Sequence, residues 1–301
     1  MSDATGEDIC GGNVVRSSTT TAASTVFSVN LTETEACKSD LFLDLEAEYN
    51  MTNKRRGLAL IFNYEYFFWQ RRIPPRDGTT VDRFKLVTRL RDLNFEVRAY
   101  DNYRKQEVFD KLHEAAEADH SDADCFLLVF LSHGKDDHVE AFDDEISIQH
   151  MTSLFREDKC RTLSGKPKIF ILQACRGDKH DDPVTPCDAV DSELEVEEVV
   201  EEAAGVHMSP AWDDFIMCYS VAEGYYSHRN NRYGSWYIQD LCELLQKYGE
   251  SLEFTELLTL VNRKVSMRSV DKCRDQDAIG KKQVPCFASM LTKKLYFRPK
   301  K

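Results

Sequence analysis

The chain has 301 residues, of which 42% are hydrophobic, and such a composition is typical of a globular protein with a substantial core. Its net charge of -13 comes from two acidic stretches, residues 1–53 with -7 and residues 188–202 with -8, so the remainder is close to neutral. A neutral body argues against a nucleic-acid partner, and the absence of a long apolar run argues against a membrane partner.

The first elements along the chain are a leader, a strand and a helix. Residues 1–53 are rich in serine, threonine and acids without sustained periodicity, so we expect a flexible leader. Residues 57–63, GLALIFN, predict a strand. Residues 80–93 predict a helix, and the threefold spacing of its apolar residues predicts one buried face: Val81, Phe84, Val87, Leu90 and Leu93.

Strand-like and helix-like segments alternate through most of the remaining sequence. Strands are expected at residues 94–100, 125–134, 167–177, 214–221 and 285–297, and helices at residues 105–118, 235–249 and 254–265. The runs CFLLVFLSHG and PKIFILQACRG are almost continuously apolar, as in central parallel strands covered on both faces. The alternation predicts an α/β fold with a mainly parallel sheet and helices on both faces.

Two potentially reactive residues stand where two of these apolar runs end. His133 lies at the exit of the run of residues 125–134, and Cys175 lies at the exit of the run of residues 167–177. Because ligand sites in such sheets lie at the carboxyl ends of strands, we expect both side chains at one rim. A cysteine needs a neighbouring base or cation to become the nucleophilic thiolate, and His133 could supply it. Each residue taken alone is more easily explained by packing.

The cysteine pattern indicates a reducing compartment. The chain has ten cysteines and none of them forms a C-x-x-C pair, which removes the basis for a zinc ribbon or a redox motif. The N-terminus also lacks the apolar segment of a secretory signal. We therefore expect free thiols and a cytoplasmic protein, with the nucleus as a second compartment.

Several motifs together resemble one family, the caspases. QACRG with an upstream SHG matches the known caspase signature. The resemblance extends over nearly all of residues 54–301, and RRGLALIFN, MCYSVAEGYYSHR, GSWYIQDLC and SLEFTELLTLVNRKVS look like the effector caspases. It implies a three-layer fold with a mainly parallel six-stranded sheet. It also implies a cysteine endopeptidase that cuts proteins after an exposed aspartate, without a cofactor or metal.

The resemblance assigns roles to residues at the rim. Cys175 would be the nucleophile and His133 the acid and base, oriented by the backbone carbonyl of Pro74. The backbone N–H groups of Gly134 and Cys175 would stabilise the oxyanion. Substrate would be bound by the following residues: Arg76, Gln173, Tyr226, Ser227, His228 and Arg229, with Asn230 facing more distant subsites.

Two arginines and an amide suit the recognition of aspartate. A carboxylate taken out of water must be paired and fully hydrogen-bonded, and the forked donors of guanidinium groups match it two at a time. Taken alone, Arg76 and Arg229 would each be surface charges in contact with water. Only their convergence would make them functional.

The resemblance also divides the chain into a leader and two subunits. Residues 1–53 would be the leader, 54–187 the large-subunit part, 188–202 an acidic processing linker and 203–301 the small-subunit part. The chain would cut itself at Asp191, or be cut by an upstream protease, and work in apoptosis. The processed halves, each a large and a small subunit, would form a homodimer.

Four acidic residues bear on further cuts. Glu202 and Glu35 stand where the family offers aspartates, which weakens cutting at both positions. Asp40 or Asp44 could substitute for Glu35 when the leader is removed.

Three other interpretations remain. The acidic segment could be an uncut surface loop, and Lys54-Arg55-Arg56 is either a solvated run or a patch that attracts acidic substrates. A catalytically silent scaffold of the same fold would lack one of the key side chains, and all of them are present. A metal site built on His133 and Cys175 has only two ligands.

Overall fold

The computed structural model describes residues 47–176, 213–223, 225–271 and 279–300. The strands of this part are β1 Leu58–Asn63, β2 Glu96–Asp101, β3 Phe126–Leu131, β4 Gly134–Lys135, β5 His138–Glu140, β6 Glu145–Ser147, β7 Lys168–Gln173, β8 Phe215–Tyr219, β9 Arg229–Asn230, β10 Gly234–Ser235 and β11 Cys286–Ser289. The helices are α1 Thr79–Asp92, α2 Lys105–Glu117, α3 Ile148–Ser153, α4 Trp236–Tyr248 and α5 Phe254–Ser266, with short 3-10 turns η1 Trp69–Arg71 and η2 Arg161–Leu163.

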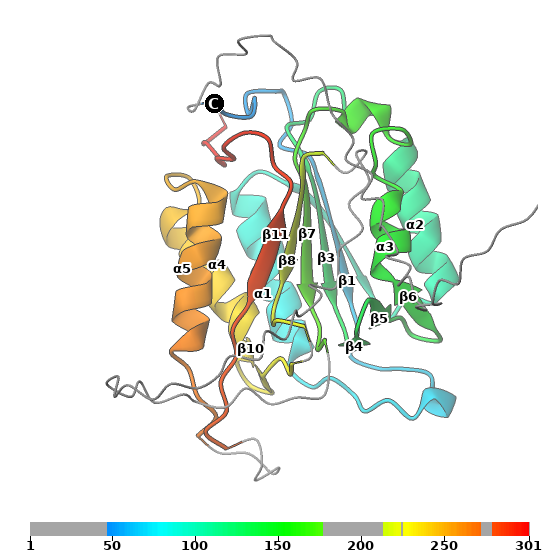
Figure 1. The fold of residues 1–301 in the computed structure, drawn as a ribbon. Coiled ribbons are helices and arrows are strands. Elements are labelled where there is room, and N and C mark those ends of the chain that lie inside the picture. Colours follow the sequence, from blue (N-terminus) through cyan, green and yellow to red (C-terminus); the bar gives the residue numbers. More distant parts are fainter. Residues whose placement is uncertain (1–46, 177–212, 224, 272–278, 301) are drawn as a thin grey trace, which may run out of the picture. The chain divides into compact units, whose positions relative to one another are not determined.

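A six-stranded sheet in the order β11-β8-β7-β3-β1-β2 forms the centre of the fold (Figure 1). Five of its strands run parallel, and β11 pairs antiparallel with β8 at the edge. The prediction of a mainly parallel six-stranded sheet is therefore confirmed. Because β1, β3 and β7 are buried along their whole length, their sequences are apolar except at the strand ends, where Asn63, Lys168 and Gln173 lie.

Two hydrophobic clusters cover the two faces of the sheet. Alternate residues of each strand point to opposite faces, so Ala59 and Ile61 lie in one cluster while Leu58 and Leu60 lie in the other. Helices α1, α4 and α5 pack on the first face, and α2 and α3 pack on the second (Figure 1). This arrangement confirms the three-layer α/β architecture.

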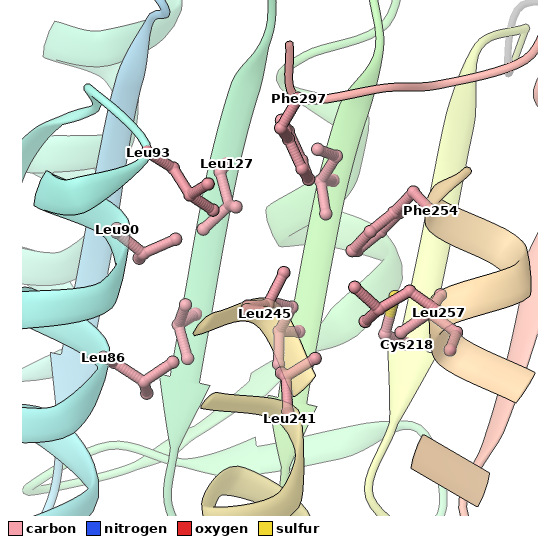
Figure 2. Close-up of a cluster of buried hydrophobic side chains, with 14 of the residues drawn as sticks. Leu86, Leu90, Leu93, Leu127, Cys218, Leu241, Leu245, Phe254, Leu257 and Phe297 are labelled. Atoms are coloured by element: carbon pink, nitrogen blue, oxygen red, sulfur yellow. The ribbon is translucent and has the colours of Figure 1, made fainter. Parts of the chain in front are cut away.

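Figure 2 shows how the first cluster joins distant parts of the sequence. Leucines of α1 and α4 and a phenylalanine and a leucine of α5 meet the strands and the C-terminal segment: Leu86, Leu90, Leu127, Leu241, Leu245, Phe254, Leu257 and Phe297. Burial of each such side chain contributes about 1.5–3 kcal/mol. The cluster therefore joins described residues before and after the acidic segment 188–202.

The predicted buried face of α1 is partly wrong. Phe84 is 70% exposed, whereas Thr79, Asp82, Leu86 and Leu90 are the buried residues of this helix. An α-helix has 3.6 residues per turn, so residues spaced strictly by three do not stay on one face. The buried residues of α1 are instead three or four positions apart. Two of the buried residues are polar, and an apolar pattern could not reveal them.

The leader boundary expected at residue 53 lies too far along the chain. Tyr49 and Met51 are each only 5% exposed. The backbone N–H of Tyr49 donates to the carbonyl of Lys294, and that of Lys294 donates to the carbonyl of Ala47. Residues 47–53 therefore belong to the packed body, and the earlier part of the expected leader lies outside the described residues.

Two of the three cations in Lys54-Arg55-Arg56 are paired. Arg55 forms an ion pair with Asp122 at 2.5 Å, and Arg56, which is 1% exposed, forms one with Asp124 at 3.1 Å. Lys54 is exposed, whereas Arg55 is half-buried and Arg56 is buried. The hypothesis of a three-residue patch that attracts acidic substrates is therefore not supported by the packing.

Two further departures from the predicted elements concern short strands. The last strand was expected over residues 285–297, but β11 is limited to Cys286–Ser289. A small antiparallel sheet of β4, β5 and β6 follows β3 and was not expected from its polar sequence.

Among the described residues, no helix combines the length and the apolar character needed to cross a membrane.

Candidate active site

Strands β3 and β7 bring His133 and Cys175 to the same rim of the sheet. The two strands are parallel neighbours in which Leu131 pairs with Gln173, and the N–H of Ser132 donates to the carbonyl of Gln173 at 3.1 Å. His133 and Cys175 each follow two residues after that pair. Both line a cavity of about 430 Å³ at this rim.

Gly134 lets the backbone after β3 lie directly against Cys175. A β-carbon at this position would come within 3.1 Å of the carbonyl oxygen of Cys175 and within 2.8 Å of that of His138. Real β-carbons essentially never approach closer than 3.0 Å, so a side chain here would displace the strand. The small residue therefore permits the close approach of these two segments.

The orientation of His133 is fixed by a backbone carbonyl. Its Nε2 atom donates to the carbonyl oxygen of Pro74 at 3.0 Å, which is the contact expected from the family resemblance. With the proton on Nε2, the lone pair of the neutral ring lies on Nδ1. Burial lowers the pKa of His133 to about 4, and the positive charges of Arg76 and Arg229 contribute to the shift. A neutral imidazole with a free lone pair is the form needed to accept a proton.

Arg76 is a cation with 1% of its surface exposed, placed by the end of β1. Its Nη1 atom donates to the carbonyl of Tyr64 at 2.9 Å and to Thr79 Oγ1 at 2.8 Å. The hydroxyl of Thr79 in turn donates to Asn63 Oδ1 at 2.7 Å. Burial, together with Arg229, lowers the pKa of Arg76 to about 9. Its Nε has no hydrogen-bond partner among the described residues, so the side chain can still donate to an anion.

Arg229 approaches the same cavity from the short strand β9. Its Nε donates to the carbonyl of Asp77 at 2.9 Å, which ties β9 to the loop that carries Arg76. Burial lowers the pKa of Arg229 as well. The thiol of Cys175 is among the groups that raise the pKa of both arginines, which is consistent with its place in the same cavity.

Gln173 and Ser227 line the same cavity as the two arginines and the thiol. The amide nitrogen of Gln173 donates to Ser227 Oγ at 2.6 Å, and its oxygen has no partner among the described residues. If the amide were turned by 180°, Ser227 would donate to the oxygen and the amide nitrogen would be available to a ligand. Gln173 therefore offers the cavity either a donor or an acceptor.

Gln283 is a supporting residue that sequence reasoning missed. It is 0% exposed, and its amide nitrogen donates to the carbonyl of Ser220 at 2.7 Å. Its amide oxygen accepts from the backbone N–H of His228 at 2.7 Å. Gln283 thus holds the segment of residues 226–229 beside the cavity, and no motif in its surroundings signals this role.

The remaining predicted residues lie at the edge of the cavity or beyond it. Tyr226 lines it and is 39% exposed, and the ring of His228 lies 4.8 Å from that of Trp236. Asn230 lines a second cavity, which shares His228 and Arg229 with the first.

Asp191, the expected processing site, lies outside the described residues. No cluster of three metal-binding side chains occurs in the part of the chain that the structure describes.

The side chains of the first cavity combine two chemical properties. A thiol and a neutral imidazole are the components of a cysteine nucleophile with its base. The buried guanidinium group of Arg76 and the half-buried one of Arg229 favour a negative charge between them, and a single carboxylate can accept from both. The cavity can therefore bind one short acidic side chain next to a reactive sulfur.

Comparisons with known proteins agree with this geometry. A family model described as caspase domain matches residues 56–296. Caspase-6 of Gallus gallus is 60% identical over 273 residues, which cover 90% of this chain and 90% of the relative. Caspase-6 of Bos taurus is 60% identical over 90% of this chain and 94% of its own length. Caspase-3 of Mesocricetus auratus is 39% identical over 84% of this chain and 88% of its own length.

Proposed function

Because the chain belongs to the caspase family of cysteine peptidases, we propose that it is an endopeptidase that cleaves proteins after aspartate, with Cys175 as nucleophile and His133 as acid and base. One observation carries the proposal. The thiol, the imidazole and both arginines line the same cavity. A catalytically silent scaffold of this fold has no need to keep all four groups together.

In the proposed mechanism, Nδ1 of His133 accepts the proton of the Cys175 thiol, while Nε2 stays bonded to the carbonyl of Pro74. The thiolate attacks the carbonyl carbon of the scissile bond, and the carbonyl π electrons move to the oxygen. The N–H groups of Gly134 and Cys175 donate to this oxyanion. His133 then returns its proton to the leaving amine, and water hydrolyses the thioester with the same base.

In the proposed pocket, Arg76, Gln173 and Arg229 bind the aspartate side chain before the cut. The burial of Arg76 and the partial burial of Arg229 make an uncharged substrate unfavourable, because asparagine would leave both guanidinium groups without a counter-charge. Tyr226 and His228 line the neighbouring subsite. Ser227 bonds the substrate backbone, and Asn230 faces the more distant subsites.

For regulation, we propose a precursor of an effector caspase, which acts in apoptosis and is activated by a cut at Asp191. Residues 54–187 and 203–301 would remain together because β7 and β8 pair along their length and share the core. The free edge of the sheet at β11 suits pairing with a second copy, in a homodimer of processed halves. An intracellular site of action, the cytoplasm and also the nucleus, fits a chain with free cysteines.

The deciding experiment compares the wild type with Cys175→Ala on three peptides that differ only in an aspartate, glutamate or asparagine before the cut. The proposal expects cleavage of the aspartate peptide by the wild type, far slower cleavage of the other two, and none by Cys175→Ala. Cys242→Ala is the matched control, because this cysteine lies on α4, is 6% exposed and should leave activity unchanged. Full activity of Cys175→Ala would overturn the proposal.

A further inference from the structure

Asp82 is a fully buried carboxylate next to the proposed pocket. It lies in the first turn of α1 and is 0% exposed. The sequence pattern does not indicate that Asp82 is buried, because the buried face predicted for this helix consists of apolar residues only. A buried carboxylate requires donors or cations around it, so its partners indicate what it does.

Ser235, the last residue of β10, supplies the hydrogen bonds to Asp82. The backbone N–H of Ser235 donates to both carboxylate oxygens, at 2.8 and 3.0 Å, and its hydroxyl donates to one of them at 2.5 Å. The preceding residue is Gly234, with a φ of +91°, and a β-carbon there would lie 2.1 Å from Asp82 Oδ1. The backbone at Gly234 therefore lies so close to the carboxylate of Asp82 that no residue with a β-carbon would fit there.

This contact acts directly on the segment that carries Arg229. In the two-stranded ladder of β9 and β10, Ser235 is the residue paired with Arg229. A carboxylate that fixes Ser235 therefore fixes the backbone opposite Arg229. On the other side, the Nε of Arg229 is bonded to the carbonyl of Asp77, in the loop between Arg76 and α1. Lys85 of α1 adds a third tie, to the carbonyl of Tyr233 at 3.0 Å.

The ionised form of Asp82 is held at an energetic cost. Burial raises its pKa to about 6, even though the bonds from Ser235 and the charges of Arg76 and Arg229 act in the opposite direction. Cys242 of α4 is also affected by the charge of Asp82, and its pKa is raised to about 12, mainly by burial. At neutral pH the carboxyl is still ionised, and the three hydrogen bonds from Ser235 suit that form.

We propose that Asp82 is a positioning residue for catalysis: by holding Ser235 it keeps Arg229 in register with Arg76, so that both guanidinium groups meet one substrate carboxylate. The inference rests on the proposed aspartate-directed activity. It predicts an effect on substrate binding rather than on the chemical step, since neither Asp82 nor Ser235 lines the cavity that contains Cys175. Small displacements of positioning groups are known to have large kinetic effects.

The test measures KM and kcat of Asp82→Ala on the aspartate peptide, with active sites counted by a covalent peptide inhibitor that ends in aspartate. We expect KM to rise about tenfold while kcat per titrated site changes less than about twofold. Ser235→Ala retains its N–H and should raise KM by a smaller factor. The double variant should be no worse than Asp82→Ala alone, because the shared bond is already lost.

Asp92→Ala is the matched control, since Asp92 ends the same helix, is 53% exposed and pairs with Arg89 at the surface. It should leave KM unchanged. An unchanged KM in Asp82→Ala, with or without a smaller titrated fraction, would overturn the inference. If Asp82→Ala does not fold, Ser235→Ala decides, and an unchanged KM in that variant overturns the inference too. A wild type that fails to cleave the peptide would instead overturn the proposed function.

Discussion

Tyr49 donates a hydrogen bond of 2.5 Å from its hydroxyl to the carboxylate of Asp214, although 165 positions separate the two residues in sequence. The same hydroxyl accepts from the backbone N–H of Thr292 at 2.9 Å. Burial, followed by the bond to Asp214, raises the pKa of Tyr49 to about 12, so the hydroxyl stays protonated at neutral pH. Tyr49, in the segment before β1, is thus hydrogen-bonded to Asp214 and to Thr292, which both belong to the proposed small-subunit part.

Tyr49→Phe should lower the free energy of unfolding by about 1–3 kcal/mol, because it leaves the buried Asp214 with one donor fewer. The hydroxyl of Thr292 still donates to Asp214 at 2.7 Å, which limits the loss. Urea denaturation of the unprocessed chain measures the change. Tyr66→Phe is the control, since Tyr66 is 56% exposed. Equal midpoints for the two variants would show that the Tyr49 hydroxyl contributes nothing.

Arg76→Lys should lower kcat/KM for the aspartate peptide by about 100-fold. An ammonium group cannot hold the carbonyl of Tyr64 and the hydroxyl of Thr79 and still offer a second donor to the substrate, as the guanidinium can. Steady-state kinetics on a variant with an unchanged melting temperature would test this. Arg91→Lys, on the exposed surface of α1, is the control. A loss below threefold for Arg76→Lys would contradict the assignment of the pocket.

The central strands could be predicted from sequence because both faces of the sheet are covered. Burial on two sides leaves little room for polar residues, so Phe126–Leu131 has no polar side chain. The position of His133 and Cys175 at one rim could be predicted too, because neighbouring parallel strands end at the same edge of the sheet. Their roles, however, came from the family resemblance and not from the strand pattern.

Polar supports were not predictable from sequence. Asp82 and Gln283 are fully buried, yet each stands among other polar residues and outside any apolar pattern of its segment. Their positions depend on contacts across 153 and 55 residues, to Ser235 and His228 respectively. Tyr49 and Met51 escaped notice for a related reason, because two hydrophobic residues among polar ones produce no periodic signal.

The lowered pKa of His133 predicts that acid weakens the fold. Its pKa is about 4 in the folded chain against 6.5 for an unperturbed histidine. Between these values the unfolded chain binds more protons at this position, so the contribution of His133 to stability falls as the pH drops from 6.5 towards 4. His133→Ala removes this contribution. The difference between its free energy of unfolding and that of the wild type should therefore change across this range, and parallel pH curves would contradict the prediction.

Asp191→Ala should leave the chain largely uncut when the purified precursor is incubated, whereas the wild type should separate into two fragments on a denaturing gel. Asp191 closes the sequence DAVD in the acidic segment 188–202, and it is the only aspartate of that segment apart from Asp188. Glu195→Ala is the control within the same segment and should split normally. Efficient division of Asp191→Ala would place the cut elsewhere.

Glu202→Asp should create an additional cut just before residue 203. The proposed pocket offers two guanidinium groups at fixed positions, because Arg76 is tied to Tyr64 and Thr79 and Arg229 to Asp77. A glutamate carries one methylene more and would place its carboxylate out of register with these donors, at a cost of about 1–3 kcal/mol, or roughly 10- to 200-fold in rate. The shorter side chain removes that cost. Mass spectrometry of the incubated Asp191→Ala/Glu202→Asp variant should find a new N-terminus at Ala203, and an uncut chain would show that the segment around residue 202 does not reach the cavity.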